Sequence, residues 1–409
     1  MTETIPKQEH SKNTAIYSVS RAFERASFYG TRTLLLFYLM ESLYSNVEFQ
    51  VFEIFGWYTL GVLISKFIGG LLGDLVLKGK LAVFLGGILQ TLGCFVLCFG
   101  AFETVIAGMG LIALGSGLYS PNILAQFARL YLDKERIMDA GFAIYYTASN
   151  IGAFFGIVLI GFVGESYGWI YGFIIAGVFM LIATIILLFK QEEQKEASLN
   201  ESRPKIKNWL VILITCFVAV ALFWNLFGIS FIAFQDIQQS ISATLPSDIN
   251  LNTWSLINSY GTMFFAAIAA IVWSYFYYNQ LMKIIVGFLT LSLGFGIVLF
   301  IDAPYNGNSM LIAVTVSIII AFAEVHISPV LNSIVTRVIN PKFLAIAFSI
   351  IFLPGFIIGK LLEDLKYNYV TQFDNTLILI IGVTGLVLIG ITLLILVKLG
   401  VLKTNYTTK

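Results

Sequence analysis

The sequence predicts an all-α integral membrane protein with twelve transmembrane helices in two bundles of six. Composition is the first reason: the 409 residues are 58% hydrophobic and only 11% charged, whereas soluble chains average about 25% charged residues. The second reason is the number of apolar runs that reach the roughly 20 residues needed to cross the hydrocarbon. The third is a polar, charged break between the sixth run and the seventh.

The apolar runs place each expected helix. The first bundle is expected at 14–189, with spans at about 14–40, 52–77, 81–100, 104–128, 140–163 and 168–189. The second is expected at 208–398, with spans at about 208–235, 253–278, 281–301, 309–336, 343–364 and 374–398. Between them lies the polar linker 190–207, and 1–13 and 399–409 are expected to be tails. Because residues 1–13 are polar, we expect no cleavable signal peptide.

Basic residues predict the orientation, since cytoplasmic loops carry an excess of lysine and arginine. One set of loops, including the linker, is rich in them, and the opposite set is acidic with Lys366 as its main exception. We therefore expect both termini and the linker in the cytoplasm. The net charge of +1 gives no reason to expect a nucleic-acid partner.

Charged side chains concentrate in the first expected span, in the stretch RAFERASFYGTR. An arginine or lysine at the bilayer centre costs about 2.5–3.5 kcal/mol on insertion scales. Helical spacing places one set of residues on a single face: Arg21, Glu24, Arg25, Phe28 and Arg32. We expect this face to line a polar transport pathway. The alternative is that Glu24 and Arg25 pair internally and only join helices.

Two more charged residues lie in expected spans. Lys66 either pairs with Glu24 or extends toward the membrane interface, and both interpretations stay open. Glu324, removed from water, suits either an ammonium ligand or a proton. Four cations against two acids favour an anionic ligand, the residues being Arg21, Arg25, Arg32 and Lys66 against Glu24 and Glu324.

The layout of six plus six spans with both ends on one side is similar to that of the major facilitator superfamily. The stretch GGLLGDLVLKGK, with Asp74 before Lys78 and Lys80, resembles the cytoplasmic motif of that superfamily, although Leu75 stands where the motif has a basic residue. The resemblance implies a substrate site between the two bundles and a gating latch at Asp74. An ordinary helix end flanked by positive charge is the other interpretation.

Several stretches resemble the proton-dependent oligopeptide transporter family. They are ERASFYGTR in the first span, SPNILAQFARLYLDKERIMDAGFAIYYTASNIGAFFG across the fourth and fifth, GWIYGF in the sixth and AEVHISP in the tenth. Trp224, and Trp254 with Asn258, continue the resemblance, which covers nearly the whole chain. The linker is too short for the two extra helices that bacterial members often insert.

The resemblance implies a role for each matching position. Arg25 and Arg32 would bind the carboxylate of a di- or tripeptide, and Glu324 would bind its amine. The other residues implied to line the substrate site are Tyr29, Asn150, Trp224 and Asn258. Proton coupling and gating are assigned to Arg21, Glu24, Arg25, Lys66, Asp74 and Glu324. For Tyr29, Asn150 and Asn258 the alternative is helix-to-helix hydrogen bonding.

The sequence departs from the family pattern at its coupling positions. Arg21 replaces a glutamate, Ser120 replaces a lysine, and Gly228 replaces a glutamate, while Leu63 stands where the family has a tyrosine of the site. Three members of the proton-coupling apparatus are therefore absent together. We expect any coupling to run through an incomplete set of groups.

The sequence thus predicts a secondary active transporter of small peptides or peptide-like anionic solutes that works by alternating access in a bacterial inner membrane. Its expected partners are the solute, the lipid bilayer and protons. We expect the protein itself to be a monomer. We expect no enzymatic activity, cofactor or metal. The alternative is a transporter-derived receptor or complex subunit that binds a protein partner without transport. Loss of the coupling residues is the reason to keep that alternative.

Overall fold

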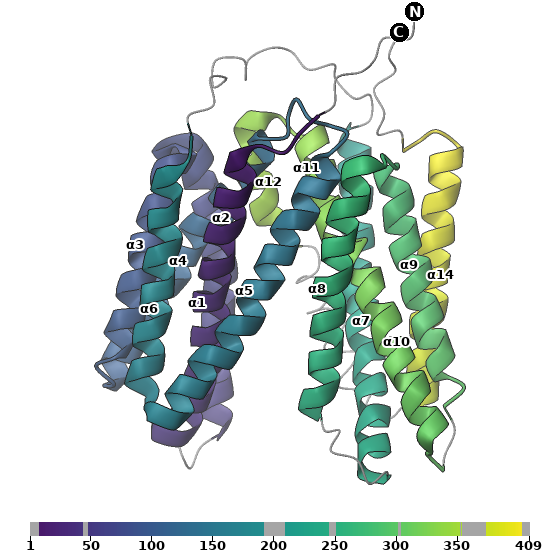
Figure 1. Cartoon of the computed structure of the whole chain (residues 1–409), viewed down its shortest axis with the longest axis horizontal. Helices are drawn as coiled ribbons and strands as arrows, with labels where there is room; N and C mark the ends of the chain where they lie inside the picture. The colour runs from purple at the N-terminus through teal and green to yellow at the C-terminus, as the bar shows by residue number, and fades with distance from the viewer. Residues whose placement is uncertain are drawn as a thin grey trace, which may run out of the picture. The chain divides into compact units, whose positions relative to one another are not determined.

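The computed structural model describes residues 8–43, 48–191, 209–244, 251–301, 304–351, 353 and 374–402. Every regular element in these ranges is a helix (Figure 1), which confirms the predicted all-α class. The chain divides into two compact units. Unit 1 comprises Met1–Glu201 and Ile339–Ile350, and unit 2 comprises Ser202–Val338 and Ile351–Lys409.

Unit 1 contains the six helices of the first half and a short helix from the second half. The long helices are α1 (Lys12–Tyr38), α2 (Glu48–Leu72), α3 (Gly79–Leu97), α4 (Phe102–Arg129), α5 (Met138–Tyr167) and α6 (Trp169–Ile186). π-helical turns at Leu39–Leu43 and Gly73–Leu77 extend α1 and α2. The short helix is α12 (Leu344–Ile350), which packs on α2 and α4 after a 3₁₀ turn at Pro341–Phe343.

Unit 2 contains α7 (Trp209–Thr244), α8 (Leu251–Tyr275), α9 (Gln280–Val298), α10 (Gly307–Val325), α11 (Ser328–Val338) and α14 (Asn375–Lys398). The expected span at 309–336 falls within Gly307–Val338, one stretch that is long and apolar enough to cross a membrane. The helix is broken within this stretch, because α10 ends at Val325 and α11 begins at Ser328. Pro329 explains this break, since proline has no N–H to donate and its ring clashes with the carbonyl four residues earlier.

Ten described helical stretches are long and apolar enough to cross a membrane. They do not include α1, which has the length, with 27 residues, but carries Arg21, Glu24, Arg25 and Arg32. The eleventh expected span, at 343–364, lies mostly outside the described residues. The count of twelve therefore stays a prediction, while the class of multi-pass membrane protein is confirmed.

Small residues position the charged helix α1 inside unit 1. A side chain on Gly152 or Gly156 of α5 would collide with the backbone of Ala22 or Ala26 of α1. Glycine at these positions lets the two helix backbones approach closely, as small residues do in membrane bundles. The charged face of α1 is thereby held at a fixed distance from α5.

Candidate functional site

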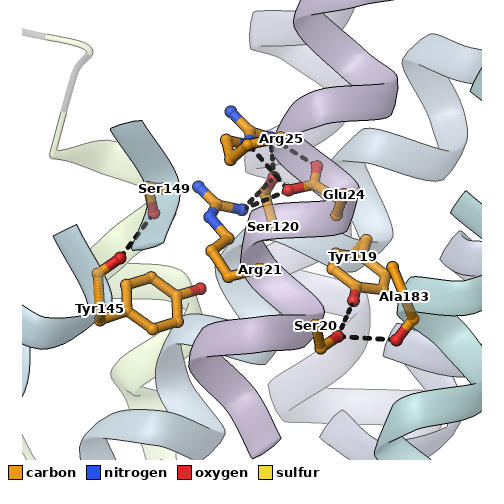
Figure 2. Close-up of polar contacts among 9 residues, drawn as sticks. All are labelled: Ser20, Arg21, Glu24, Arg25, Tyr119, Ser120, Tyr145, Ser149 and Ala183. Carbon is orange, nitrogen blue, oxygen red and sulfur yellow. Dashed lines mark hydrogen bonds and ion pairs between the residues drawn. The ribbon is translucent and has the colours of Figure 1, made fainter. Parts of the chain in front are cut away.

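The charged face of α1 forms one connected cluster with Ser120 of α4 (Figure 2). The two oxygens of Glu24 accept from Arg25, at 2.7 Å from Nε and 2.5 Å from Nη2. Arg21 Nη1 donates to the same carboxylate at 3.0 Å. Ser120 Oγ accepts from Arg21 Nη1 at 3.2 Å and from Arg25 Nη2 at 3.1 Å. One carboxylate and one hydroxyl therefore hold two guanidinium groups.

Burial makes these contacts strong. Glu24 is 0% exposed and Arg25 is 5% exposed, so each charge would be costly without its partner. The guanidinium of Arg25 also lies 4.9 Å from the ring centre of Phe28 and 5.3 Å from that of Tyr29. Internal pairing of Glu24 with Arg25, one of the two interpretations of the sequence, is thus present, but it involves Arg21 as well.

Two cations of unit 1 lie outside this pairing. Arg32 is half-buried, with its guanidinium 5.2 Å from the ring centre of Phe55 and Nη2 3.5 Å from Thr59 Oγ1, a long contact to a neutral group. Lys66 lies within electrostatic range of Glu24, yet it forms no hydrogen bond or ion pair with any residue that the structure describes. The ion pair between Lys66 and Glu24, one of the two interpretations of the sequence, is therefore absent among the described residues. Among the charged residues in the middle of α1 and α2, four are basic (Arg21, Arg25, Arg32 and Lys66) and one, Glu24, is acidic.

Two polar residues of unit 1, Tyr29 and Asn150, are expected to line the substrate site. Tyr29 is half-buried beside Arg25. Asn150 donates from Nδ2 to the carbonyl of Tyr146 at 2.9 Å, which is a bond within its own helix. This bond does not join two helices, so it does not support the helix-to-helix alternative for Asn150. It also leaves the side-chain oxygen of Asn150 unused.

Unit 2 holds a second polar group, built around Glu324 of α10. The carboxyl is 8% exposed and accepts from Thr262 Oγ1 of α8 at 3.2 Å. Asn258, one helical turn before Thr262, lies within hydrogen-bonding range of the same carboxyl. The Oδ1 atom of Asn258 is buried and has no partner among the described residues. No basic side chain pairs with Glu324 in the described part of the chain, so a cationic ligand group suits it.

A cavity of about 130 Å³ lies beside Asn258, between α7 and α8. Its lining residues are Phe231, Gln235, Gln238, Trp254, Ser255, Asn258 and Ser259. Trp254 thus belongs to the cavity wall, whereas Trp224 is not in it and packs on Phe223 and Phe227. The two glutamines were missed by sequence reasoning, although polar residues three apart in an apolar helix form a recognisable signal.

Asp74, in the π-helical turn that follows α2, contacts both α4 and α12. Its side chain is 1% exposed, Oδ1 accepts from Arg129 Nη2 at 3.3 Å, and Oδ2 accepts from the backbone N–H of Ile346 at 2.9 Å. Arg129 also donates to the carbonyl of Pro341 at 3.1 Å. A carboxylate at the first turn of a helix is stabilising. Asp74 thus joins segments about 270 residues apart within unit 1, and its role as a gating latch stays a prediction.

Comparison with known proteins identifies the family. The model of the Major Facilitator Superfamily matches residues 17–362, which is most of the chain. The chain belongs to the major facilitator superfamily.

Within this superfamily the chain is similar to several bacterial peptide transporters. It is 29% identical over 195 residues to dipeptide and tripeptide permease B of Photorhabdus asymbiotica, a match that covers 47% of this chain and 40% of the permease. It is 32% identical over 175 residues to peptide transporter YePEPT of Yersinia enterocolitica, covering 41% and 34% of the two chains. The matched part is therefore less than half of either curated relative.

Solved structures show the same fold over nearly the full length. A peptide transporter POT crystallised with sulfate superimposes with a TM-score of 0.65 at 22% identity, covering 97% of this chain and 96% of the other. A POT family transporter crystallised with 5-aminolevulinic acid gives 0.63 at 19% identity, covering 96% and 98%. At these identities the likeness concerns the fold.

Proposed function

We propose that this superfamily member is a secondary transporter of small peptides or peptide-like solutes that carry an anionic group. The named activities of the curated relatives support peptide-like solutes. The motifs shared with the proton-dependent oligopeptide transporter family extend over both halves of the chain. Such transporters work by alternating access.

The proposal rests on the excess of cations over acids among the charged residues in the middle of α1 and α2, where Arg21, Arg25, Arg32 and Lys66 stand against Glu24. Arg21 and Arg25 share a single carboxylate, that of Glu24. Among the residues that the structure describes, Arg32 contacts a neutral hydroxyl and an aromatic ring. A carboxylate of the solute would supply the acid that Arg32 lacks, and guanidinium groups bind carboxylates through two parallel hydrogen bonds.

The polar group of unit 2 suits the other end of a peptide. A buried carboxyl with only neutral donors around it, as in Glu324, favours an ammonium ligand. Asn258 offers an amide oxygen without a partner in the described residues, which suits a backbone N–H of the solute. We assign the amino end of the solute to Glu324 and a backbone amide to Asn258.

Proton coupling is proposed to be weak and to depend on Glu324. Glu24 is engaged by two guanidinium groups, which stabilise its charged form. Ser120 and Gly228 stand at two family coupling positions and do not titrate. Glu324 is the remaining acid of the implied coupling set that has no cationic partner in the described part of the chain.

We further propose that the protein is a monomer in a bacterial inner membrane with both termini in the cytoplasm. The basic loops described above support this orientation.

Uptake by reconstituted vesicles tests the function. Labelled acidic, neutral and basic dipeptides are offered with and without an imposed pH gradient. We expect saturable uptake of the acidic or neutral peptides with little stimulation by the gradient. Peptide binding by purified protein without any uptake would instead favour the receptor alternative, and stoichiometric co-purification of a protein partner would identify it.

A further inference from the structure

Two buried hydrogen-bond donors beside the α1 cluster have no acceptor among the described residues. They are Nε of Arg21 and the hydroxyl of Tyr145 on α5. The guanidinium carbon of Arg21 lies 5.5 Å from the ring centre of Tyr145, and Figure 2 shows the tyrosine hydroxyl directed toward Arg21. The side chains that carry the two donors are therefore neighbours.

Tyr119 nearby shows how such a hydroxyl is ordinarily satisfied. It is fully buried and hydrogen-bonds to Ser20 Oγ at 2.6 Å, while Ser20 also reaches the carbonyl of Ala183 at 2.7 Å (Figure 2). Tyr145 is 4% exposed, so its hydroxyl is nearly as deeply buried but lacks this arrangement. A buried donor without a partner is destabilising, so each one in a native structure calls for a group that completes its bond.

The chemistry of the region selects the kind of group. Arginine donates and cannot accept, so the ligand atom at Arg21 Nε must be an acceptor. Arg21 and Arg25 act electrostatically on Tyr145, against the one carboxylate of Glu24. Positive surroundings and two donors favour an anionic oxygen over a neutral one.

We infer that Arg21 and Tyr145 form a subsite for a second acidic group, an oxyanion separate from the carboxylate assigned to Arg32. This inference rests on the proposed function and narrows its solute class to compounds with two anionic groups, such as peptides with an acidic side chain. Arg21 stands where the resemblance to the oligopeptide transporter family implies an acid, so this part of the proposed subsite departs from the family pattern. The same oxyanion chemistry is also offered by a free inorganic anion bound beside the solute.

Isosteric peptides separate charge from size. Binding of alanyl-glutamate and alanyl-glutamine to purified protein is measured for the wild type, Tyr145→Phe and Arg21→Gln. Tyr145→Phe keeps the ring that packs on Phe127 and Arg21 and removes only the hydroxyl. Tyr167→Phe, an exposed tyrosine on the same helix, is the matched control. Sulfate without peptide is the probe for a free anion.

We expect the wild type to prefer alanyl-glutamate by about tenfold, the ratio that one charged hydrogen bond supplies. Both Tyr145→Phe and Arg21→Gln should abolish that preference. The Tyr145→Phe protein should still bind alanyl-glutamine as tightly as the wild type does. Alternatively, sulfate alone binds and Tyr145→Phe weakens it about tenfold, which assigns the subsite to a free anion and supports the inference even if no peptide binds. Equal affinity for both peptides together with no Tyr145-dependent sulfate binding overturns it. If both peptides bind with equal affinity, the second subsite is wrong but the proposed function, binding of small peptides, still holds.

Discussion

Arg25 donates to both carboxylate oxygens of Glu24, its neighbour in the chain, and the pair is almost completely buried. Adjacent residues of a helix point about 100° apart around its axis, so these two long side chains bend toward each other across the charged face. Arg21, one turn earlier, completes the arrangement by donating to the same acid. Glu24 therefore supplies the negative charge that balances the guanidinium groups of Arg21 and Arg25 inside unit 1.

Replacing Glu24 should destabilise the protein. Glu24→Gln leaves two buried guanidinium groups without a countercharge, and breaking a buried pair costs about 3–5 kcal/mol. Thermal unfolding of the purified protein measures the loss. Glu103→Gln, at an exposed position at the start of α4, should change the unfolding temperature little. A Glu24→Gln protein as stable as the wild type would show that the pair is not structural.

Arg32 should affect binding much more than folding. Arg32→Ala removes a guanidinium whose described contacts are a long bond to Thr59 and the ring of Phe55, so we expect little change in unfolding temperature. Loss of a charge pair with the carboxylate of dialanine should weaken binding by about 2–3 kcal/mol. Arg32→Lys should recover part of this, because an ammonium lacks the planar fork. Unchanged affinity in folded Arg32→Ala protein would contradict the assignment.

Glu324 should recognise the amino end of the solute. Glu324→Gln keeps a partner for Thr262 but removes the charge, so dialanine should bind at least tenfold more weakly, by about 1.5–3 kcal/mol. N-acetylated dialanine has no ammonium group, and its affinity for the wild type and for Glu324→Gln should be equal. Isothermal titration of the four combinations measures both effects. A parallel loss for both peptides would point to a general disturbance of unit 2.

His10 should make the segment before α1 sensitive to pH. Its ring nitrogen Nδ1 lies 2.8 Å from Tyr131 Oη. Burial, and then the positive charge of Lys134, lower the pKa of His10. The fold therefore stabilises the neutral ring, and this contribution is complete above about pH 6.5 and is lost as the pH falls below that value.

Hydrogen exchange of residues 8–14, corrected for intrinsic rates, measures this effect. Protection should be lower at pH 5.5 than at pH 7.5 in the wild type. His10→Gln, which does not titrate, should show equal protection at both values. Equal protection in the wild type would contradict the expected dependence.

The helices followed from the sequence because apolar runs of spanning length leave few alternatives to a membrane helix. The break between α10 and α11 was missed, although Pro329 carries the signal for it. Packing of α12 on α2 and α4 could not be predicted, because contacts between residues about 270 positions apart, such as Asp74 with Ile346, leave no periodic pattern.

The candidate site was predictable in its charges but not in its pairing. Helical spacing placed Arg21, Glu24 and Arg25 on one face, yet spacing cannot tell that Ser120 accepts from both arginines. Tyr145 was passed over for a related reason. A tyrosine in an apolar helix is ordinary until the structure shows which hydroxyl lacks a partner.

Unit 1 is proposed to bind an anionic group of a transported peptide. Competition for uptake of labelled dialanine into reconstituted vesicles measures this. Unlabelled dialanine and dialanine amide differ only in the terminal carboxylate. We expect dialanine to abolish labelled uptake and the amide to need at least about tenfold higher concentration, the ratio expected for one lost charged contact. Equal competition by the two compounds, or uptake no greater than in protein-free vesicles, would contradict it.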